Sequence, residues 1–413
     1  MRIAILQPSL AWRGGAERQI LNLAVELQRA GHEVELFTCT LNDNCYPELL
    51  SQLTVNVVKA PIRGIRVNKT PARGVSLMCP QVAKRRGVAG RLVGSFRNYY
   101  SLFAMINLGR KIPKGFDVIN IHNPPTEWAA FLAKKRLNAP IVWMCNEPPF
   151  WFTDSSQRKG LGKINLPLYE GLDRVAVDYV DRIVVLSAIA GRRVEQAYGR
   201  PYEIVHSGVS IDRFHKASGR ELCARYGLEK DFVLLQVGNI AVDKKQTDSI
   251  RALHMVSKKH PNVKLIFDGE GPKEHLLSLS RQLGVEDKVM FLHSGSDAEL
   301  AQLYAACDVF LFPSQITWGL AVIEAMTASK PVLVSNKSGA SEVICNGENG
   351  FVLQEPYPEN MALTIEKLIV NAELRKKIGE NAYYYARQNL SWEMYAKNMA
   401  QVFKEALDNY RNP

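Results

Sequence analysis

The sequence predicts an α/β protein built from two doubly wound domains, each with a mainly parallel sheet. The chain has 413 residues, which is more than a single hydrophobic core usually supports. Short apolar runs alternate with amphipathic segments of helical period along both halves, a pattern typical of β-α-β units. Glycine-containing turns follow several of the apolar runs, and such turns form the ligand-binding edge of parallel sheets.

The first half opens with a β-α-β unit. Residues 3–6 form a strand-like apolar run, and the segment after Gly15 places apolar side chains on one helical face as far as Gly31. Further strands are predicted at residues 34–38, 116–122, 141–145 and 181–187, and a further helix at residues 128–137. Gly14 and Gly15 fit either a plain tight turn or a loop that approaches a ligand.

The second half repeats this alternation. Strands are predicted at residues 232–237, 263–267, 289–292 and 309–312, and helices at residues 247–259, 275–283 and 298–306. We place the domain boundary near residue 200, so that residues 1–199 form the first domain and residues 200–390 the second. Residues 391–413 are predicted to contain the terminal helix.

One strand-to-helix crossing in the second half has the features of an anion site. The apolar run at residues 309–312 ends at Pro313, and a helical period begins after Gly319. A helix that begins there presents free backbone N–H groups and the positive end of its dipole, which suits a phosphate. Glu324 lies about one turn further along this helix.

The composition is that of an ordinary globular protein, with no run of residues long and apolar enough for a membrane span. The N-terminal apolar run lacks a signal-peptide cleavage site. The seven cysteines are scattered without a Cys-x-x-Cys pair. We therefore expect neither a disulfide framework nor a zinc site, and this cysteine usage fits a reducing cytoplasm.

Positive charge is concentrated in one block. Residues 49–116 contain thirteen lysine and arginine residues and no acidic residue. Such a block usually faces an anionic partner. Its segment at residues 91–110 fits either a helix packed on the core or a surface that lies on anionic lipid. Nucleic acid is disfavoured, because aromatic and basic residues do not alternate as in single-strand binding platforms and no DNA-reading motif is present.

The stretch from Phe312 to Met326 resembles the nucleotide-sugar pocket of the retaining GT-B glycosyltransferases of family 4. Its Pro-Ser, Trp-Gly-Leu and Glu-Ala-Met pieces fall in register with that pocket. Residues 14–18 resemble the family's glycine loop, and residues 202–214 resemble its inter-domain segment. The resemblance covers nearly the whole chain. It implies two Rossmann-like domains that face each other across a cleft, with the terminal helix crossing back onto the first domain.

The resemblance also implies roles for individual residues. Gly14, Glu17 and His122 would lie on the acceptor side, although His122 also fits a hydrogen-bonded histidine at a strand end. The donor-binding residues would be Gly15, Asn239, Lys244, Leu292, Ile316, Gly319, Leu320 and Glu324. Lys244 and Asn146 would be the catalytic residues, with Lys244 stabilising the charge of the leaving diphosphate.

Three of these positions depart from the family's pattern. Relatives often carry histidine at the position of Asn146, arginine at that of Asn239 and glutamate at that of Ile316. None of the three replacements is ionisable. Because Glu324 and Lys244 are retained, the sequence favours nucleotide binding more firmly than it favours turnover.

The resemblance implies a hexosyltransferase, and the absence of an Asp-x-Asp pair indicates that it works without a metal ion. It would transfer mannose or a similar hexose from a nucleoside-diphosphate sugar to a lipid-linked or polysaccharide acceptor, with retention of configuration. We expect no cofactor, no nucleic-acid partner, and a cytoplasmic protein that contacts the anionic inner face of the cell membrane. The alternative is a catalytically weak sugar-nucleotide-binding subunit of a glycan-assembly complex.

Overall fold

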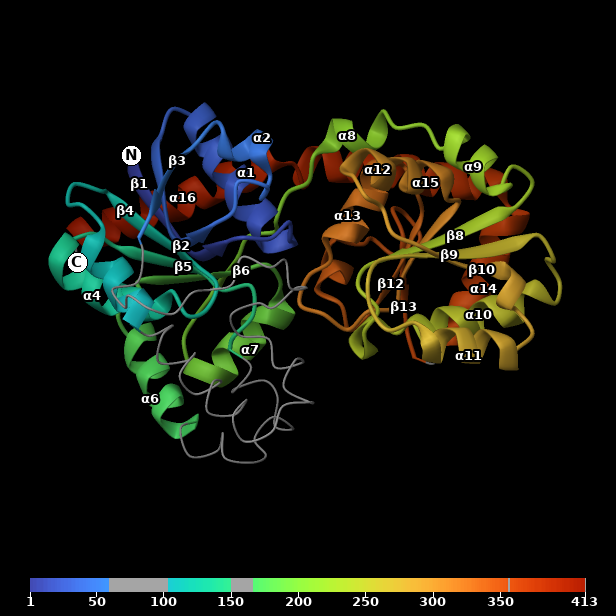
Figure 1. Cartoon of the computed structure of the whole chain (residues 1–413), viewed down its shortest axis with the longest axis horizontal. Coiled ribbons are helices and arrows are strands. Elements are labelled where there is room, and N and C mark those ends of the chain that lie inside the picture. The colour runs from blue at the N-terminus through green and yellow to red at the C-terminus, as the bar shows by residue number, and fades with distance from the viewer. Residues whose placement is uncertain (59–102, 150–165, 356, 413) are drawn as a thin grey trace. The chain divides into compact units, whose positions relative to one another are not determined.

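The computed structural model describes residues 1–58, 103–149, 166–355 and 357–412, and the chain divides into two compact units (Figure 1). Unit 1 comprises Met1–Leu186, Ala190–Val205 and Ala396–Pro413, and unit 2 comprises Ser187–Ile189 and His206–Tyr395. The main boundary therefore falls between Val205 and His206, a few residues beyond residue 200.

Unit 1 contains a seven-stranded parallel sheet in the order β3-β2-β1-β4-β5-β6-β7. Its strands are β1 (Arg2–Leu10), β2 (Glu33–Leu41), β3 (Thr54–Val57), β4 (Val118–His122), β5 (Ile141–Met144), β6 (Arg182–Val185) and β7 (Glu203–Ile204). Leu6 of β1 lies opposite Ile121 of β4. Every residue of β4 and β5 is buried, as is typical of a parallel sheet covered on both faces.

The helices of unit 1 are α1 (Gly15–Arg29), α2 (Pro47–Leu50), α4 (Glu127–Leu137), α6 (Leu166–Val177), α7 (Ala188–Tyr198) and most of α16 (Trp392–Arg411). Residues 103–111 are also helical. Helix α1 forms because its apolar residues share one face, and that face is buried. It ends before Gly31, which has a φ of +85°.

Unit 2 contains a six-stranded parallel sheet in the order β10-β9-β8-β11-β12-β13. Its strands are β8 (Phe232–Val237), β9 (Val263–Asp268), β10 (Val289–Leu292), β11 (Val309–Phe312), β12 (Val332–Ser335) and β13 (Phe351–Leu353). Leu235 of β8 lies opposite Phe310 of β11. Apolar residues of the central strands and of the covering helices form one continuous core.

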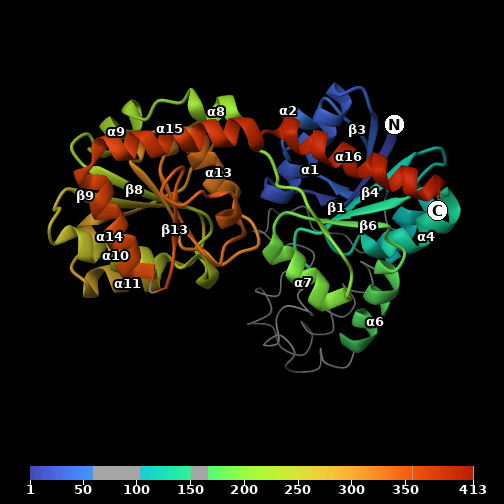
Figure 2. The same cartoon turned by 180° about the vertical axis from the view of Figure 1, so that it is seen from behind.

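Helices cover both faces of this second sheet. They are α8 (Ile211–His215), α9 (Arg220–Tyr226), α10 (Gln246–Ser257), α11 (Glu274–Gln282), α12 (Asp297–Ala306), α13 (Leu320–Thr327), α14 (Tyr357–Val370) and α15 (Ala372–Asn389). Figures 1 and 2 show α10, α11 and α14 on one face, and α8, α12, α13 and α15 on the other. Unit 2 is thus a doubly wound domain, as is unit 1.

The structure adds four strands that the sequence analysis did not predict, β3 and β7 in unit 1 and β12 and β13 in unit 2. Strand β3 lies at the start of the basic block, and β7 pairs with β6 through Val184 and Glu203. The run at residues 181–187 is therefore not the last strand of unit 1. Strands β3, β7 and β13 lie at edges of their sheets, and β3 and β7 carry only a weak hydrophobic pattern. Strand β12 is a short buried strand inside its sheet. Most of the segment at residues 91–110, for which a core-packed helix and a lipid-facing surface were both left open, lies outside the described residues.

Candidate donor and acceptor sites

Each sheet has one point at which its strand order reverses. In unit 1 this point lies between β1 and β4, and in unit 2 it lies between β8 and β11. In doubly wound sheets, ligands bind outside the carboxyl ends of the strands at this switch point. The loops that follow these four strands carry most of the residues that the sequence analysis selected as site residues.

Helix α13 begins immediately beyond the switch point of unit 2. Gly319 is its N-cap and Leu320 its first residue, so the helix starts where the sequence predicts it. A β-carbon on Gly319 would lie 2.7 Å from two atoms of the Phe312 ring. Glycine at this position therefore lets the turn pack directly on the end of β11. The first backbone N–H groups of α13 have no partner within the helix, and they form a local positive pole.

Glu324 lies on the second turn of α13 and is nearly buried, with 6% of its surface exposed. The hydroxyl of Tyr304 donates a hydrogen bond of 2.8 Å to its Oε2 atom. Its backbone carbonyl accepts a hydrogen bond from Oγ1 of Thr327. Because the carboxylate and its backbone are both anchored, Glu324 has one defined orientation. The sequence analysis did not identify Tyr304, because twenty residues separate the two side chains and only the fold brings them together.

The loop after β8 carries Asn239 and Lys244. It approaches the loop after β9 so closely that a β-carbon on Gly269 would lie 2.3 Å from the carbonyl oxygen of Gly238. The buried side chains of Gln236 and Gln246 hold the loop from below, by donating to the carbonyls of Lys244 and Asn239, respectively. The backbone carbonyls of the loop therefore accept the hydrogen bonds that hold it in place.

The side chain of Lys244 is about one-fifth exposed, and its Nζ atom lies 3.6 Å from Asp243. The same aspartate accepts the backbone N–H of Gln315 through its carbonyl, at 2.9 Å. This bond joins the Lys244 loop to the turn between β11 and α13. The loop that carries Lys244 and the turn that leads into α13 are therefore hydrogen-bonded neighbours.

Ile316 occupies the position at which the family pattern has a glutamate. Its side chain is half-buried, and its carbonyl accepts the backbone N–H of Gly339 at 2.9 Å. Ser314, two residues earlier, is buried, and its hydroxyl has no hydrogen-bond partner among the residues that the structure describes. Ser314 is thus a polar group at this turn that the sequence analysis did not select.

Leu292 ends β10, and its carbonyl accepts the backbone N–H of Gly269 at 3.3 Å. The next residue, His293, lies 3.4 Å from the carboxylate of Glu270, and both side chains are exposed. Leu292 therefore lies in the same group of strand-end loops as Asn239. The structure brings Asn239, Lys244, Leu292, Ile316, Gly319, Leu320 and Glu324 to the carboxyl edge of the sheet in unit 2.

The glycine loop of unit 1 precedes α1. Gly14 is the N-cap, and the carboxylate of Glu17 folds back towards it, forming backbone hydrogen bonds at Gly14 and at Glu17 itself. Burial raises the pKa of Glu17, and these two hydrogen bonds oppose the rise. The buried Tyr46 donates its hydroxyl to the carbonyl of Gly14 at 3.2 Å. Glu17 thus shapes the loop, and Gly15 remains exposed as the first residue of α1.

Asn146 follows β5 and belongs to a network of amide side chains. Its Nδ2 atom donates to Oε1 of Gln19 at 3.0 Å and to Oδ1 of Asn123 at 2.9 Å. Asn123 in turn donates to Gln7 at 3.3 Å. The Oδ1 atom of Asn146 is buried, without a hydrogen-bond partner in the described part of the chain. The network joins the ends of β1, β4 and β5 to α1, and Asn123 and Gln19 were not predicted.

His122 is completely buried at the end of β4. Its Nε2 atom lies 2.6 Å from Oδ1 of Asn120, and burial lowers the pKa of its imidazole to about 3. This is the geometry of a neutral, hydrogen-bonded histidine at a strand end. His122 supports the sheet beneath the loop of Asn123 and does not reach the surface of unit 1.

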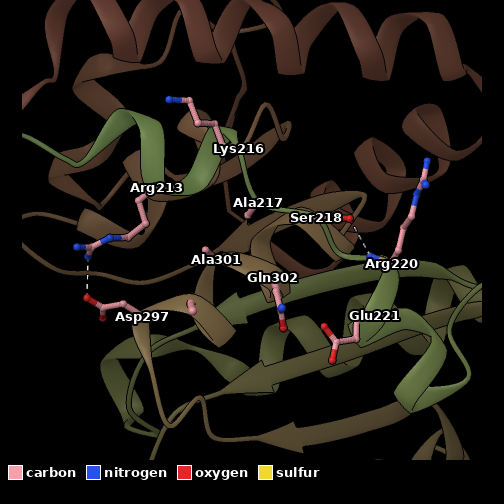
Figure 3. Close-up of a pocket in the computed structure, with 10 residues that line it drawn as sticks. Arg213, Lys216, Ala217, Ser218, Arg220, Glu221, Asp297, Ala301 and Gln302 are labelled. Atoms are coloured by element: carbon pink, nitrogen blue, oxygen red, sulfur yellow. Dashed lines mark hydrogen bonds and ion pairs between the residues drawn. The ribbon is translucent and has the colours of Figure 1, made fainter.

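A pocket of about 580 Å³ lies elsewhere in unit 2, between α8, α9 and α12 (Figure 3). Arg213 on α8 donates to Asp297 on α12 at 2.7 Å across one side of it. None of the predicted site residues lines this pocket. Within the described ranges, no group of three or more histidine, cysteine or acidic side chains could hold a metal ion. No described helix is both long and apolar enough to cross a membrane.

The two sheets and their switch-point loops define a GT-B glycosyltransferase, a class built from two Rossmann-like domains. Two family profiles match the chain, Glycosyltransferase Family 4 over residues 13–213 and Glycosyl transferases group 1 over residues 221–385. Together they cover both units. The chain therefore belongs to the glycosyltransferases that these two profiles describe, and it is a transferase.

Similar proteins carry related descriptions. The chain is 26% identical to the spore coat protein SA of Bacillus subtilis, with 72% of this chain and 81% of that protein aligned. It is also 26% identical to a D-inositol 3-phosphate glycosyltransferase of Streptomyces bingchenggensis, with 98% and 88% aligned.

Solved structures share the fold. The Anabaena protein HepE in complex with UDP and glucose superposes with a TM-score of 0.70 at 21% identity, covering 98% of this chain and 100% of that one. WaaG, a glycosyltransferase involved in lipopolysaccharide biosynthesis, superposes with a TM-score of 0.69 at 20% identity, covering 97% and 99%.

Proposed function

We propose that the protein is a retaining hexosyltransferase that uses a nucleoside-diphosphate sugar as donor. The observation that carries the proposal is the buried Glu324, fixed by Tyr304 on a helix that begins at the switch point of unit 2. A carboxylate in this position suits the paired hydroxyls of a ribose, because each hydroxyl donates one hydrogen bond. HepE, whose fold this chain shares, binds UDP and glucose.

The donor diphosphate would lie at the start of α13. Its negative charge would meet the free N–H groups of Gly319 and Leu320, the hydroxyl of Ser314 and the ammonium of Lys244. These groups stabilise charge that develops on the leaving diphosphate without a proton transfer. We therefore expect turnover without a bound metal ion.

Transfer with retention requires no strong side-chain base in this scheme. The leaving diphosphate accepts the proton of the acceptor hydroxyl on the same face of the sugar. Asn146, which cannot titrate, would instead orient the sugar or the acceptor through its carboxamide. Gly14 and Glu17 would shape the acceptor side of unit 1.

We propose mannose or a similar hexose as the transferred sugar, and a lipid-linked or polysaccharide molecule as the acceptor. WaaG, described as involved in lipopolysaccharide biosynthesis, supports an acceptor of this kind. The basic block at residues 49–116 would bring the protein to an anionic inner membrane face. Flotation with anionic liposomes at low salt tests this contact, and absence of binding would contradict it.

A second candidate function is sugar-nucleotide binding with little turnover. It is favoured by the three departures at Asn146, Asn239 and Ile316. The variant Ile316→Glu separates the two functions. A gain in donor turnover would favour a decayed enzyme, and a loss would indicate a pocket adapted to a different donor sugar.

The proposed donor class is tested by thermal unfolding with GDP, UDP, ADP and their common sugar derivatives. A ligand at one hundred times its dissociation constant adds roughly 2.7 kcal/mol of stability. We expect selective stabilisation by one base, increased by one sugar. If no nucleotide stabilises the protein, the proposed function is wrong.

A further inference from the structure

Tyr304 and Glu324 form a hydrogen bond between two helices of unit 2. Tyr304 is completely buried on α12, and its hydroxyl lies 2.8 Å from Oε2 of Glu324 on α13. A buried carboxylate oxygen without a donor is destabilising, so the phenol is a stabilising partner. Burial and the neighbouring Glu324 raise the pKa of Tyr304 well above its ordinary value, and the phenol therefore keeps its proton.

Aromatic side chains fix the ring of Tyr304 on two sides. Phe214 of α8 meets it edge to face, with the ring centroids 5.3 Å apart, and Phe310 of β11 lies 5.6 Å away. Helix α8, which carries Phe214, is also joined to α12, which carries Tyr304, by the ion pair between Arg213 and Asp297 at 2.7 Å. This ion pair lies at the side of the pocket in Figure 3. The hydroxyl of Tyr304 therefore has little freedom to follow a moving carboxylate.

Tyr304 contacts only one of the two carboxylate oxygens of Glu324 in this hydrogen bond. Tyr304 occupies Oε2 of Glu324, whereas the proposed ribose needs an acceptor for its hydroxyls. A carboxylate accepts about four hydrogen bonds, so the single bond from Tyr304 does not exhaust the capacity of Glu324. A carboxylate fixed before binding also loses less side-chain entropy when the ligand arrives.

We infer that Tyr304 is a positioning residue for nucleotide recognition, which holds Glu324 in the orientation that accepts both ribose hydroxyls of a nucleoside diphosphate. This inference rests on the proposed function. Through Glu324, Tyr304 would make the site selective for nucleotides with an intact 2′,3′-diol, although the phenol itself does not contact the ligand.

The test compares a nucleoside diphosphate with its 2′,3′-dideoxy analogue, using the base that best stabilises the wild type. Dissociation constants are measured by calorimetry for the wild type, Tyr304→Phe and Tyr357→Phe. Tyr357 is the matched control, because it is also a buried tyrosine of unit 2 with a hydrogen-bonded hydroxyl, but its partners are Ser335 and Asn336. We expect the wild type and Tyr357→Phe to bind the diol-containing ligand about ten- to a hundredfold more tightly. In Tyr304→Phe the dissociation constants of the two ligands should differ by no more than about threefold.

Glu324→Gln and the double variant with Tyr304→Phe keep the test valid if the single variant Tyr304→Phe does not fold. Glu324→Gln alone should lose the diol preference, and adding Tyr304→Phe to it should change the ratio no further. A Tyr304→Phe variant that binds nucleotide with the full diol preference would overturn the inference and leave the proposed function intact. A wild type that binds no nucleoside diphosphate would overturn both.

Discussion

The backbone N–H of Gln315 donates to the carbonyl of Asp243 at 2.9 Å, which joins the turn before α13 to the loop of Lys244. Two segments that lie more than seventy residues apart in the chain thus share one hydrogen bond at the switch point of unit 2. The bond explains why a helix start and a lysine ammonium can serve the same ligand.

Lys244→Met should weaken binding of the nucleoside diphosphate about tenfold, because it removes one charge-assisted contact to the diphosphate. The loss should be larger at low salt than at high salt, where screening already weakens the wild-type contact. Calorimetric titration at two salt concentrations checks both expectations. Lys230→Met is the control, because it removes an exposed lysine of the same unit. Equal effects of the two substitutions would contradict a role for Lys244.

Gly319→Ala should destabilise unit 2 by about 1–3 kcal/mol, because the added methyl group meets the Phe312 ring at 2.7 Å. It should also weaken nucleotide binding, since the start of α13 has to move. Gly171→Ala offers a control, because its added β-carbon would meet no described atom within 4 Å beyond its chain neighbours and the backbone of its own helix, and alanine favours a helix. Thermal unfolding of both variants checks the contrast, and equal melting temperatures would refute the packing argument.

Asn146→Ala should lower turnover more than donor affinity. The substitution removes hydrogen bonds to Gln19 and Asn123 in unit 1, whereas the donor nucleotide is assigned to unit 2. We expect hydrolysis of the stabilising sugar donor to fall about tenfold or more, with the dissociation constant for the nucleoside diphosphate unchanged. The control is Asn22→Ala, whose amide donates only within α1. A change confined to affinity would contradict the assignment.

The buried carboxyl groups of Glu127 and Asp173 predict a pH-dependent stability of unit 1. Asp173 accepts from Trp128 at 2.6 Å and from Tyr198 at 2.9 Å, whereas neither oxygen of Glu127 meets a donor among the described residues. Burial, and then the charge of Asp173, raises the pKa of Glu127 well above its usual 4.5. A protonated Glu127 that donates to Asp173 satisfies the pair.

The sign of the effect follows from the raised pKa of folded Glu127. Its stabilising contribution is complete below its unfolded pKa and is lost as the pH rises through the folded pKa. The melting temperature should therefore fall with increasing pH above about 4.5, and it should fall less steeply in Glu127→Gln. Parallel pH profiles for the two proteins would show that Glu127 is not the responsible group.

Sequence patterns predicted the elements that carry strong local signals. The strands at Phe232–Val237 and Val309–Phe312 were predicted with the bounds that the structure gives, and α13 begins at the expected Leu320. Continuous apolar runs and a glycine at the crossing make these signals unambiguous. The short edge strands β3 and β7 carry no such pattern, because only one of their sides pairs with the sheet.

The site was predictable only in part, for a physical reason. Residues that follow strands, such as Asn146, can be placed by topology alone, because strand ends meet at one edge of a sheet. Their partners depend on tertiary packing: Tyr304 reaches Glu324 from another helix, and Gln19 reaches Asn146 from α1. Neither partner has a sequence spacing that distinguishes it from a core residue.

The most direct test of the account is a calorimetric titration of the preferred nucleoside diphosphate into the wild type and into Glu324→Gln. Glutamine keeps the size of the side chain and an oxygen for Tyr304, so the variant should fold normally. We predict one binding site per chain in the wild type, and affinity that is about ten- to a hundredfold weaker in the variant. Equal affinity of the two proteins would contradict the assignment of Glu324 to the ribose.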